Sequence, residues 1–229
     1  MATNSKNSLV ARSGFRAEDI LCISPLVLEC LGTQYFQKRI VKCEKKSGNT
    51  KSDVIFTFED GTQTKAQLKN GTGGGRGWSF DRRPVDTMPA SEAAKELLKI
   101  VCLKAAGERK NLAMEQELVR QLIFGQDESS KPEHFLHTTI KDGQIVSLTA
   151  CPASLFVDTI LKGAYETFNA KRTCVHLTNL IYLQRKGGGK ADHAPDHIQA
   201  KLCKMPDCMT TIILVQTTPA QQEQTPEEH

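Results

Sequence analysis

The alternation of apolar and polar positions is clearest in the second quarter of the chain. Residues 53–58 are rich in β-branched and aromatic side chains, a composition that favours a strand. The dipeptide Asp60-Gly61 follows, and such a pair favours a tight hairpin. Residues 64–69 then supply the return strand. The pattern therefore predicts a two-stranded ribbon.

Helical spacing of apolar residues marks three other parts of the chain. The first is residues 15–31, where Pro25 predicts a kink or two short helices. The second is residues 90–124, which we expect Gly107 to divide, and the third is residues 153–168. Short strands are expected at residues 145–148, 174–183, 198–202 and 211–215. This order of elements is compatible with an α/β protein.

Length and composition bound the class of protein. The chain has 229 residues, and its 39% hydrophobic and 24% charged residues are ordinary for a globular protein. No apolar run approaches the roughly 18 residues of a membrane span, and the N-terminus lacks the apolar stretch of a signal peptide. We expect a cytoplasmic (intracellular) protein without membrane contact, with one domain at residues 1–216 and a disordered tail at residues 217–229.

The cysteines and histidines allow two interpretations. Eight cysteines are scattered through apolar surroundings, so most are expected to be reduced, buried, small hydrophobic residues. A zinc site is the alternative, but its spacing is loose, and Pro195 argues against a helix with both histidines on one face. Its ligands would be His193, His197, Cys203 and Cys208. The first interpretation is preferred.

Positive charge is concentrated in the first third of the chain. The net charge is +4, but residues 36–83 carry eleven Lys and Arg against five Asp and Glu. This excess is consistent with a polyanionic partner and equally with a solvated surface.

Three polar residues of the predicted ribbon suggest a chemistry. Gln67 and Lys69 are two positions apart on one strand and therefore project from the same face, with Leu68 turned into the core. The hairpin places Asp53 opposite that end of the return strand. A carboxylate, an amide oxygen and a lysine suit phosphodiester hydrolysis, because Mg²⁺ prefers oxygen ligands and an ammonium group stabilises developing negative charge.

This stretch resembles the signature of the PD-(D/E)xK nuclease superfamily, in which an aspartate on one strand precedes (D/E)xK on the next. Asp53 matches the first acid and Lys69 the lysine, whereas Gln67 stands where the family usually has Asp or Glu. Family members often carry a glutamate of the metal site on the first helix. Glu18 is the candidate for that role, with Asp19 as the alternative.

The resemblance implies a fold and an activity. The implied fold is α/β, with a central mixed sheet flanked by helices as in restriction endonucleases. The implied activity is that of a type II restriction enzyme: Mg²⁺-dependent, sequence-specific cleavage of double-stranded DNA, with Asp53, Gln67 and Glu18 at the metal. Many such enzymes are homodimers on palindromic sites. The alternatives are a nuclease of DNA repair or mobile elements, and a DNA-binding module that has lost catalysis.

Two further segments are candidates for DNA contact. Residues 71–83 combine glycines, arginines and aromatic residues, as expected of a mobile arm that becomes ordered on DNA. Residues 182–189 and 197–201 resemble a late strand–turn–strand segment of some restriction endonucleases, where cations beside a glycine turn suit a phosphate or a guanine edge. The candidate DNA-binding residues are Arg76, Arg82, Arg83, Gln184, Arg185 and Lys186.

Overall fold

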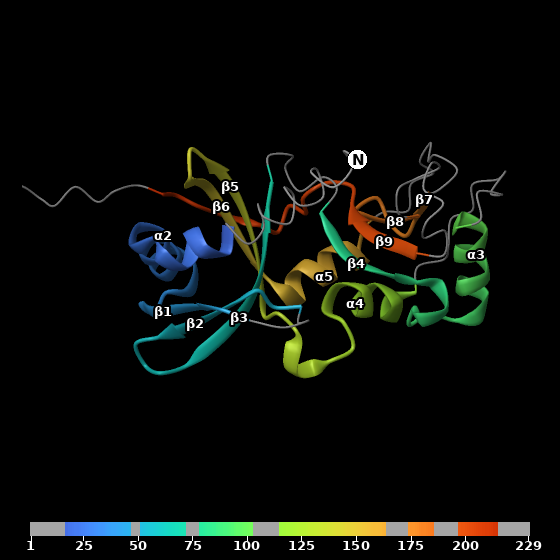
Figure 1. Cartoon of the computed structure of the whole chain (residues 1–229), viewed down its shortest axis with the longest axis horizontal. Coiled ribbons are helices and arrows are strands. Elements are labelled where there is room, and N and C mark those ends of the chain that lie inside the picture. Colours follow the sequence, from blue (N-terminus) through green and yellow to red (C-terminus); the bar gives the residue numbers. More distant parts are fainter. Residues whose placement is uncertain are drawn as a thin grey trace, which may run out of the picture.

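A computed structural model describes residues 17–46, 51–71, 78–102, 115–163, 174–185 and 197–214. In these ranges two β-sheets are accompanied by helices (Figure 1). The larger sheet is mixed and has helices on both sides, which confirms the predicted α/β class. The predicted tail, the arm residues 72–77, Gly107 and the glycine turn 187–189 lie outside the described residues.

The central sheet has six strands in the order β1-β2-β3-β5-β6-β10. All neighbouring strands are antiparallel except β3 and β5, which are parallel. Parallel strands need a long crossover, and in the described part of this connection strand β4 of the second sheet and two α-helices lie between β3 and β5. The strands are β1 Ile40–Lys45, β2 Val54–Phe58, β3 Gln63–Asn70, β5 His134–Lys141, β6 Gln144–Pro152 and β10 Thr210–Ile212.

The second sheet has four antiparallel strands in the order β4-β9-β8-β7. They are β4 Ser79–Pro84, β7 Cys174–His176, β8 Ile181–Arg185 and β9 His197–Leu202. Helix α3, Glu92–Cys102, packs on this sheet. Helix α5, Ala153–Leu161, lies between the two sheets, and helix α4, Gln116–Phe124, packs beside α5 and against β4 (Figure 1).

Helical residues 17–23 and helix α2, Pro25–Leu31, cover the opposite face of the central sheet (Figure 1). Pro25 occupies the first turn of α2, where its missing N–H costs no helical hydrogen bond. Short helical turns follow at η1 Gly32–Phe36, η2 Val85–Thr87 and η3 Glu128–Ser130.

The alternation along the strands divides the buried residues into two cores. Leu68 of β3 and Leu136 of β5 pack with α2. Phe135, which precedes Leu136 on β5, packs instead with Trp78 and Phe80 under α4 and α5. The central sheet therefore presents two different faces, which we call the α2 face and the α5 face.

The β2–β3 hairpin forms as predicted. Val54 pairs with Ala66 and Thr57 with Gln63. In the turn, the Asp60 carboxylate accepts a hydrogen bond from the Thr62 backbone N–H and forms an ion pair with Lys38 at 2.7 Å, and these contacts hold the pKa of Asp60 below its usual range. Gly61 has φ +78°, a left-handed conformation that favours glycine.

Several expectations from the sequence are wrong. Residues 78–84 are not a mobile arm, because Ser79–Pro84 is strand β4 and Trp78 and Phe80 are buried in the core of the α5 face. Residues 174–183 form two strands with a turn between them rather than one strand. Strand β5, which lies in the middle of the central sheet, was not expected at all.

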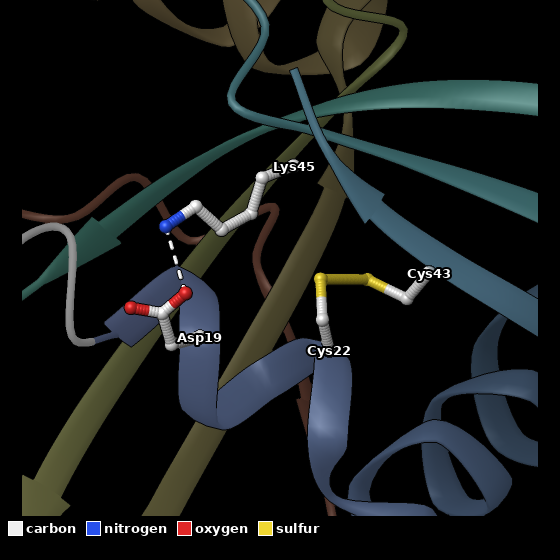
Figure 2. Close-up of a disulfide and its surroundings, with 4 residues drawn as sticks. All are labelled: Asp19, Cys22, Cys43 and Lys45. Carbon is white, nitrogen blue, oxygen red and sulfur yellow. Dashed lines mark hydrogen bonds and ion pairs between the residues drawn. A yellow bond between two sulfur atoms is a disulfide. The ribbon is translucent and has the colours of Figure 1, made fainter. Parts of the chain in front are cut away.

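One cysteine pair departs from the expected reduced state. Cys22 and Cys43 form a disulfide that joins helical residues 17–23 to β1 (Figure 2). Of the other cysteines that the structure describes, Cys30 and Cys151 are buried and Cys203 and Cys208 are half-buried. Among the described helices, none is long and apolar enough to cross a membrane.

Candidate active site

Asp53 lies immediately before β2, where the ribbon enters the central sheet. Its backbone N–H donates to the carbonyl of Ala66 at 2.8 Å, which continues the pairing of β2 with β3. Its carboxylate accepts the backbone N–H of Leu68 at 2.7 Å. Burial raises the pKa of Asp53, whereas Lys69 and the Leu68 N–H act to lower it. The side chain is thus fixed against β3 with one carboxylate oxygen committed to the backbone.

Gln67 and Lys69 project from the α5 face of β3, with Leu68 packed in the core of the α2 face between them. Burial lowers the pKa of Lys69, and the charges of Asp53 and Glu18 oppose that shift. These mutual effects show that Lys69, Asp53 and Glu18 form one electrostatic cluster.

Gln67 is 4% exposed, yet its side-chain oxygen Oε1 has no hydrogen-bond partner in the described protein. A buried carbonyl oxygen without a partner costs about 1–3 kcal/mol. Since native proteins rarely leave such a group unsatisfied, the oxygen requires an occupant that the described part of the chain does not provide.

Glu18 belongs to helical residues 17–23 and is partly buried. Burial raises its pKa first, and the charge of Asp53 raises it further, while Lys45 and Lys69 lower it. Asp19, the alternative candidate, forms an ion pair with Lys45 at 2.7 Å (Figure 2). The structure therefore favours Glu18 as the acid that interacts with Asp53.

Two connections hold the helical segment of Glu18 against β1. The Cys22–Cys43 disulfide is one, and the Asp19–Lys45 ion pair is the other (Figure 2). On the helical segment, Asp19 and Cys22 are about one turn apart. Glu18 reaches the cluster from a separate element, and these connections set its position.

The cluster offers oxygen ligands for a hard cation. The donors are the carboxylates of Asp53 and Glu18 and the unpartnered amide oxygen of Gln67, and this set suits Mg²⁺. Within the described residues no group of three His, Cys, Asp or Glu side chains could hold a metal ion. Gln67 is therefore essential to a site of three protein oxygens.

The candidate DNA-binding residues that the structure describes lie on the second sheet. Arg82 of β4 and Gln184 of β8 both pair with Gln199 of β9, so the three residues form one row across this sheet. Sequence inspection missed Gln199, because only the pairing of β9 with both neighbours places it there. Arg83 and Arg185 both pair with Ile198. Arg76 and Lys186 lie outside the described residues.

His137 was not singled out in the sequence, although it pairs directly with Lys69 across β3 and β5. Its signal is weak: it is a histidine in an apolar strand, two positions from Phe135. A cavity of about 940 Å³ lies elsewhere, between α2, η1 and β1, and none of the four candidate active-site residues lines it.

No protein-family model and no curated protein matches the chain. Among solved structures, the crystal structure of restriction endonuclease MspI in complex with its cognate DNA is similar in fold. The sequence identity is 14%, the TM-score is 0.43, and the similarity covers 78% of this chain and 76% of that chain.

Proposed function

We propose that this protein is a magnesium-dependent endonuclease that hydrolyses phosphodiester bonds of double-stranded DNA at a specific sequence, as a homodimer. The observation that carries the proposal is the buried, unpartnered oxygen of Gln67 on the strand where the Asp53 carboxylate accepts the Leu68 N–H, between Gln67 and Lys69. Three potential oxygen ligands and one partly buried cation in one cluster match what phosphodiester hydrolysis requires.

Each side chain has a distinct part in the proposed reaction. Asp53, Gln67 and Glu18 would hold Mg²⁺, which supplies an acidified water and neutralises charge on the phosphate. The Lys69 ammonium group stabilises the negative charge that develops on the phosphate oxygens and orients the attacking water. Its partial burial strengthens this interaction, since less water competes for the charge than at the surface.

A DNA-binding module without catalysis is the second candidate. The observation in its favour is Gln67 itself, because a neutral amide brings one negative charge fewer to the cation than the family's usual carboxylate. The row of Arg82, Gln199 and Gln184 on the second sheet would still bind DNA in such a protein.

Incubation of the purified protein with supercoiled plasmid and Mg²⁺ separates these functions. Discrete linear fragments are expected, and EDTA should abolish them. Nonspecific nicking would contradict sequence specificity. Retention of uncut plasmid in a gel-shift assay, with no product at any Mg²⁺ or Mn²⁺ concentration, would establish the binding module instead.

The Asp53→Asn variant tests the acid of the site and should affect activity and stability in opposite directions. Cleavage should fall at least ~100-fold, the scale of removing a group that stabilises the transition state. DNA affinity should stay within a few-fold, because the amide oxygen still accepts the Leu68 N–H. Since burial raises the pKa of Asp53, ionisation costs folding free energy without metal, and that cost is present at pH values above the raised pKa.

The variant should therefore unfold at a higher temperature than wild type at pH 7 in EDTA. The difference should shrink as the pH falls through the pKa of Asp53 in the folded protein and vanish below its pKa in the unfolded chain. A rise of about 2–4 °C would correspond to about 1 kcal/mol. Differential scanning calorimetry at pH 4 and pH 7 measures it. A variant that cuts at the wild-type rate would remove Asp53 from the site.

A further inference from the structure

The α5 face of the central sheet carries a polar row next to Lys69. Lys69 of β3 pairs with His137 of β5, His137 pairs with Thr149 of β6, and Thr149 pairs with Thr211 of β10. Directly paired residues point to the same face of a sheet, so these four side chains form a continuous line across four strands. The row begins in the proposed active site and ends at an exposed residue.

Trp78 lies beside this row. Its ring centroid is 6.0 Å from that of His137 and 5.8 Å from that of Phe135. The residue is 6% exposed, but its indole nitrogen Nε1 has no hydrogen-bond partner in the described protein. An indole N–H can only donate, and a buried indole normally finds an acceptor.

Two polar groups of the row itself also lack a hydrogen-bond partner among the described residues. The Thr149 hydroxyl Oγ1 is buried and has no partner among the described residues. His137 is 8% exposed and its imidazole makes no hydrogen bond to another described residue. Burial alone lowers the pKa of His137, so the neutral ring offers one N–H donor at neutral pH.

The chemistry of these groups selects the occupant. Trp78 and Lys69 can only donate hydrogen bonds, and Thr149 and His137 can each donate one. Three donors next to the Lys69 ammonium suit an acceptor-rich anion, and a phosphate group is such an anion. By contrast, the nearby oxygen of Gln67 is an acceptor, so it requires a donor or a cation and not an anion.

We propose that His137, Thr149 and Trp78 form a subsite that binds a backbone phosphate of the DNA substrate next to Lys69. This inference rests on the proposed function, because it takes the substrate of the adjacent cluster to be DNA. His137 is then a substrate-binding residue that the nuclease signature does not include. Its Nε2 atom lies 4.0 Å from the position that a Cβ on Gly71 would occupy, so the ring extends toward the end of β3.

Trp78 is the one tryptophan of the chain, and its fluorescence therefore reports on this subsite directly. The probes are inorganic phosphate and a plasmid-derived duplex in Ca²⁺, which replaces Mg²⁺ to slow cleavage. Both should change the Trp78 emission of the wild-type protein. The His137→Ala variant should bind each probe about tenfold more weakly, as the removal of one hydrogen bond to a charged group predicts.

Two variants separate contact from structural damage. His137→Gln keeps an N–H donor and should recover part of the affinity, and it replaces His137→Ala if that variant does not fold. His134→Gln is the matched control, since His134 lies on the same strand, faces α2 and bonds to Tyr35. It should bind and cut like wild type.

The outcomes distinguish this proposal from the nuclease activity. Plasmid cleavage by the wild-type protein tests the activity alone, whereas the phosphate titration tests the subsite even if no DNA is cut. An emission spectrum that neither probe changes would overturn the proposal, because it would show that His137, Thr149 and Trp78 bind no phosphate. Unaltered affinity and cleavage in both His137 variants would likewise overturn the subsite.

Discussion

The two faces of the central sheet treat their buried polar groups differently. On the α2 face, Thr64 donates to Glu133 at 2.6 Å and His134 bonds to Tyr35 at 2.9 Å. On the α5 face, Gln67 and Thr149 keep buried oxygens that have no partner in the described protein. On the α2 face these buried polar groups are satisfied, whereas on the α5 face Gln67 and Thr149 are not.

This difference distinguishes polar groups that stabilise the fold from polar groups that are available to a ligand. Satisfied groups stabilise the fold, because each hydrogen bond contributes about 1 kcal/mol and its removal leaves a buried group unpaired. Unsatisfied groups weaken the isolated protein, and they persist where a ligand completes them. Unsatisfied polar residues on the α5 face should accordingly affect activity more than stability, and hydrogen-bonded polar residues on the α2 face the reverse.

The largest expected effect is at Gln67. Gln67→Ala removes an oxygen ligand of the proposed metal and should reduce cleavage at least ~100-fold, the scale of removing a group that stabilises the transition state. Gln67→Glu keeps the oxygen, adds a negative charge, and should retain cleavage with a lower Mg²⁺ requirement. Initial rates across a Mg²⁺ titration measure both. If the alanine variant cleaves DNA at the wild-type rate, the Gln67 oxygen is not a ligand of the catalytic metal.

A matched pair of threonines tests the contrast most directly. Thr64→Val breaks the bond to Glu133 and should lower the free energy of unfolding by about 1–2 kcal/mol without changing DNA cleavage. Thr149→Val removes a hydroxyl that has no partner in the described protein, so it should leave stability unchanged or raised and weaken DNA binding a few-fold. Urea unfolding and DNA titration on both variants give the comparison. An equal decrease of stability in both variants would contradict the difference between the two faces.

The smallest effect is expected on the second sheet. Arg82→Gln combined with Arg83→Gln should weaken binding to all DNA sequences. The slope of log affinity against log salt should become shallower by about 0.9 for each arginine that pairs with a phosphate in the wild-type complex. The matched control is Lys162→Gln, a change of one exposed cation at the end of α5. A slope that the double substitution leaves unchanged would place these arginines of β4 away from DNA.

Local patterns were sufficient to predict the hairpin and the cluster of candidates on it. Val54 to Phe58 and the Asp60-Gly61 turn are determined by near neighbours in the chain, and they bring Asp53 to Gln67 and Lys69. Strand β5 was missed because it is central, so polar His137 and Thr138 stand among its apolar residues and no alternation is visible. The arm around Trp78 was misassigned because its glycines and arginines resemble a surface loop, whereas pairing with β9 buries its aromatic residues.

The remaining features depend on contacts between distant parts of the chain. The bond between Cys22 and Cys43 requires helical residues 17–23 to lie on β1, which neither local pattern specifies. The isolation of the Gln67 oxygen is likewise invisible in the sequence, because a glutamine in a strand normally finds a partner. Gln67 itself was nonetheless a candidate from its place two positions before Lys69 on the strand.

The parallel pairing of β3 with β5 also constrains how the chain reaches this structure. The β1–β3 meander joins neighbouring segments and can form early, since it closes only short loops. The pairing of β5 with β3 joins segments about 65 residues apart in the chain, which is a non-local step of the kind that slows folding. The contact of Lys69 with Asp53 depends on the short-range hairpin, whereas its pairing with His137 depends on this long-range step, so the two halves of the proposed site differ in how local their contacts are.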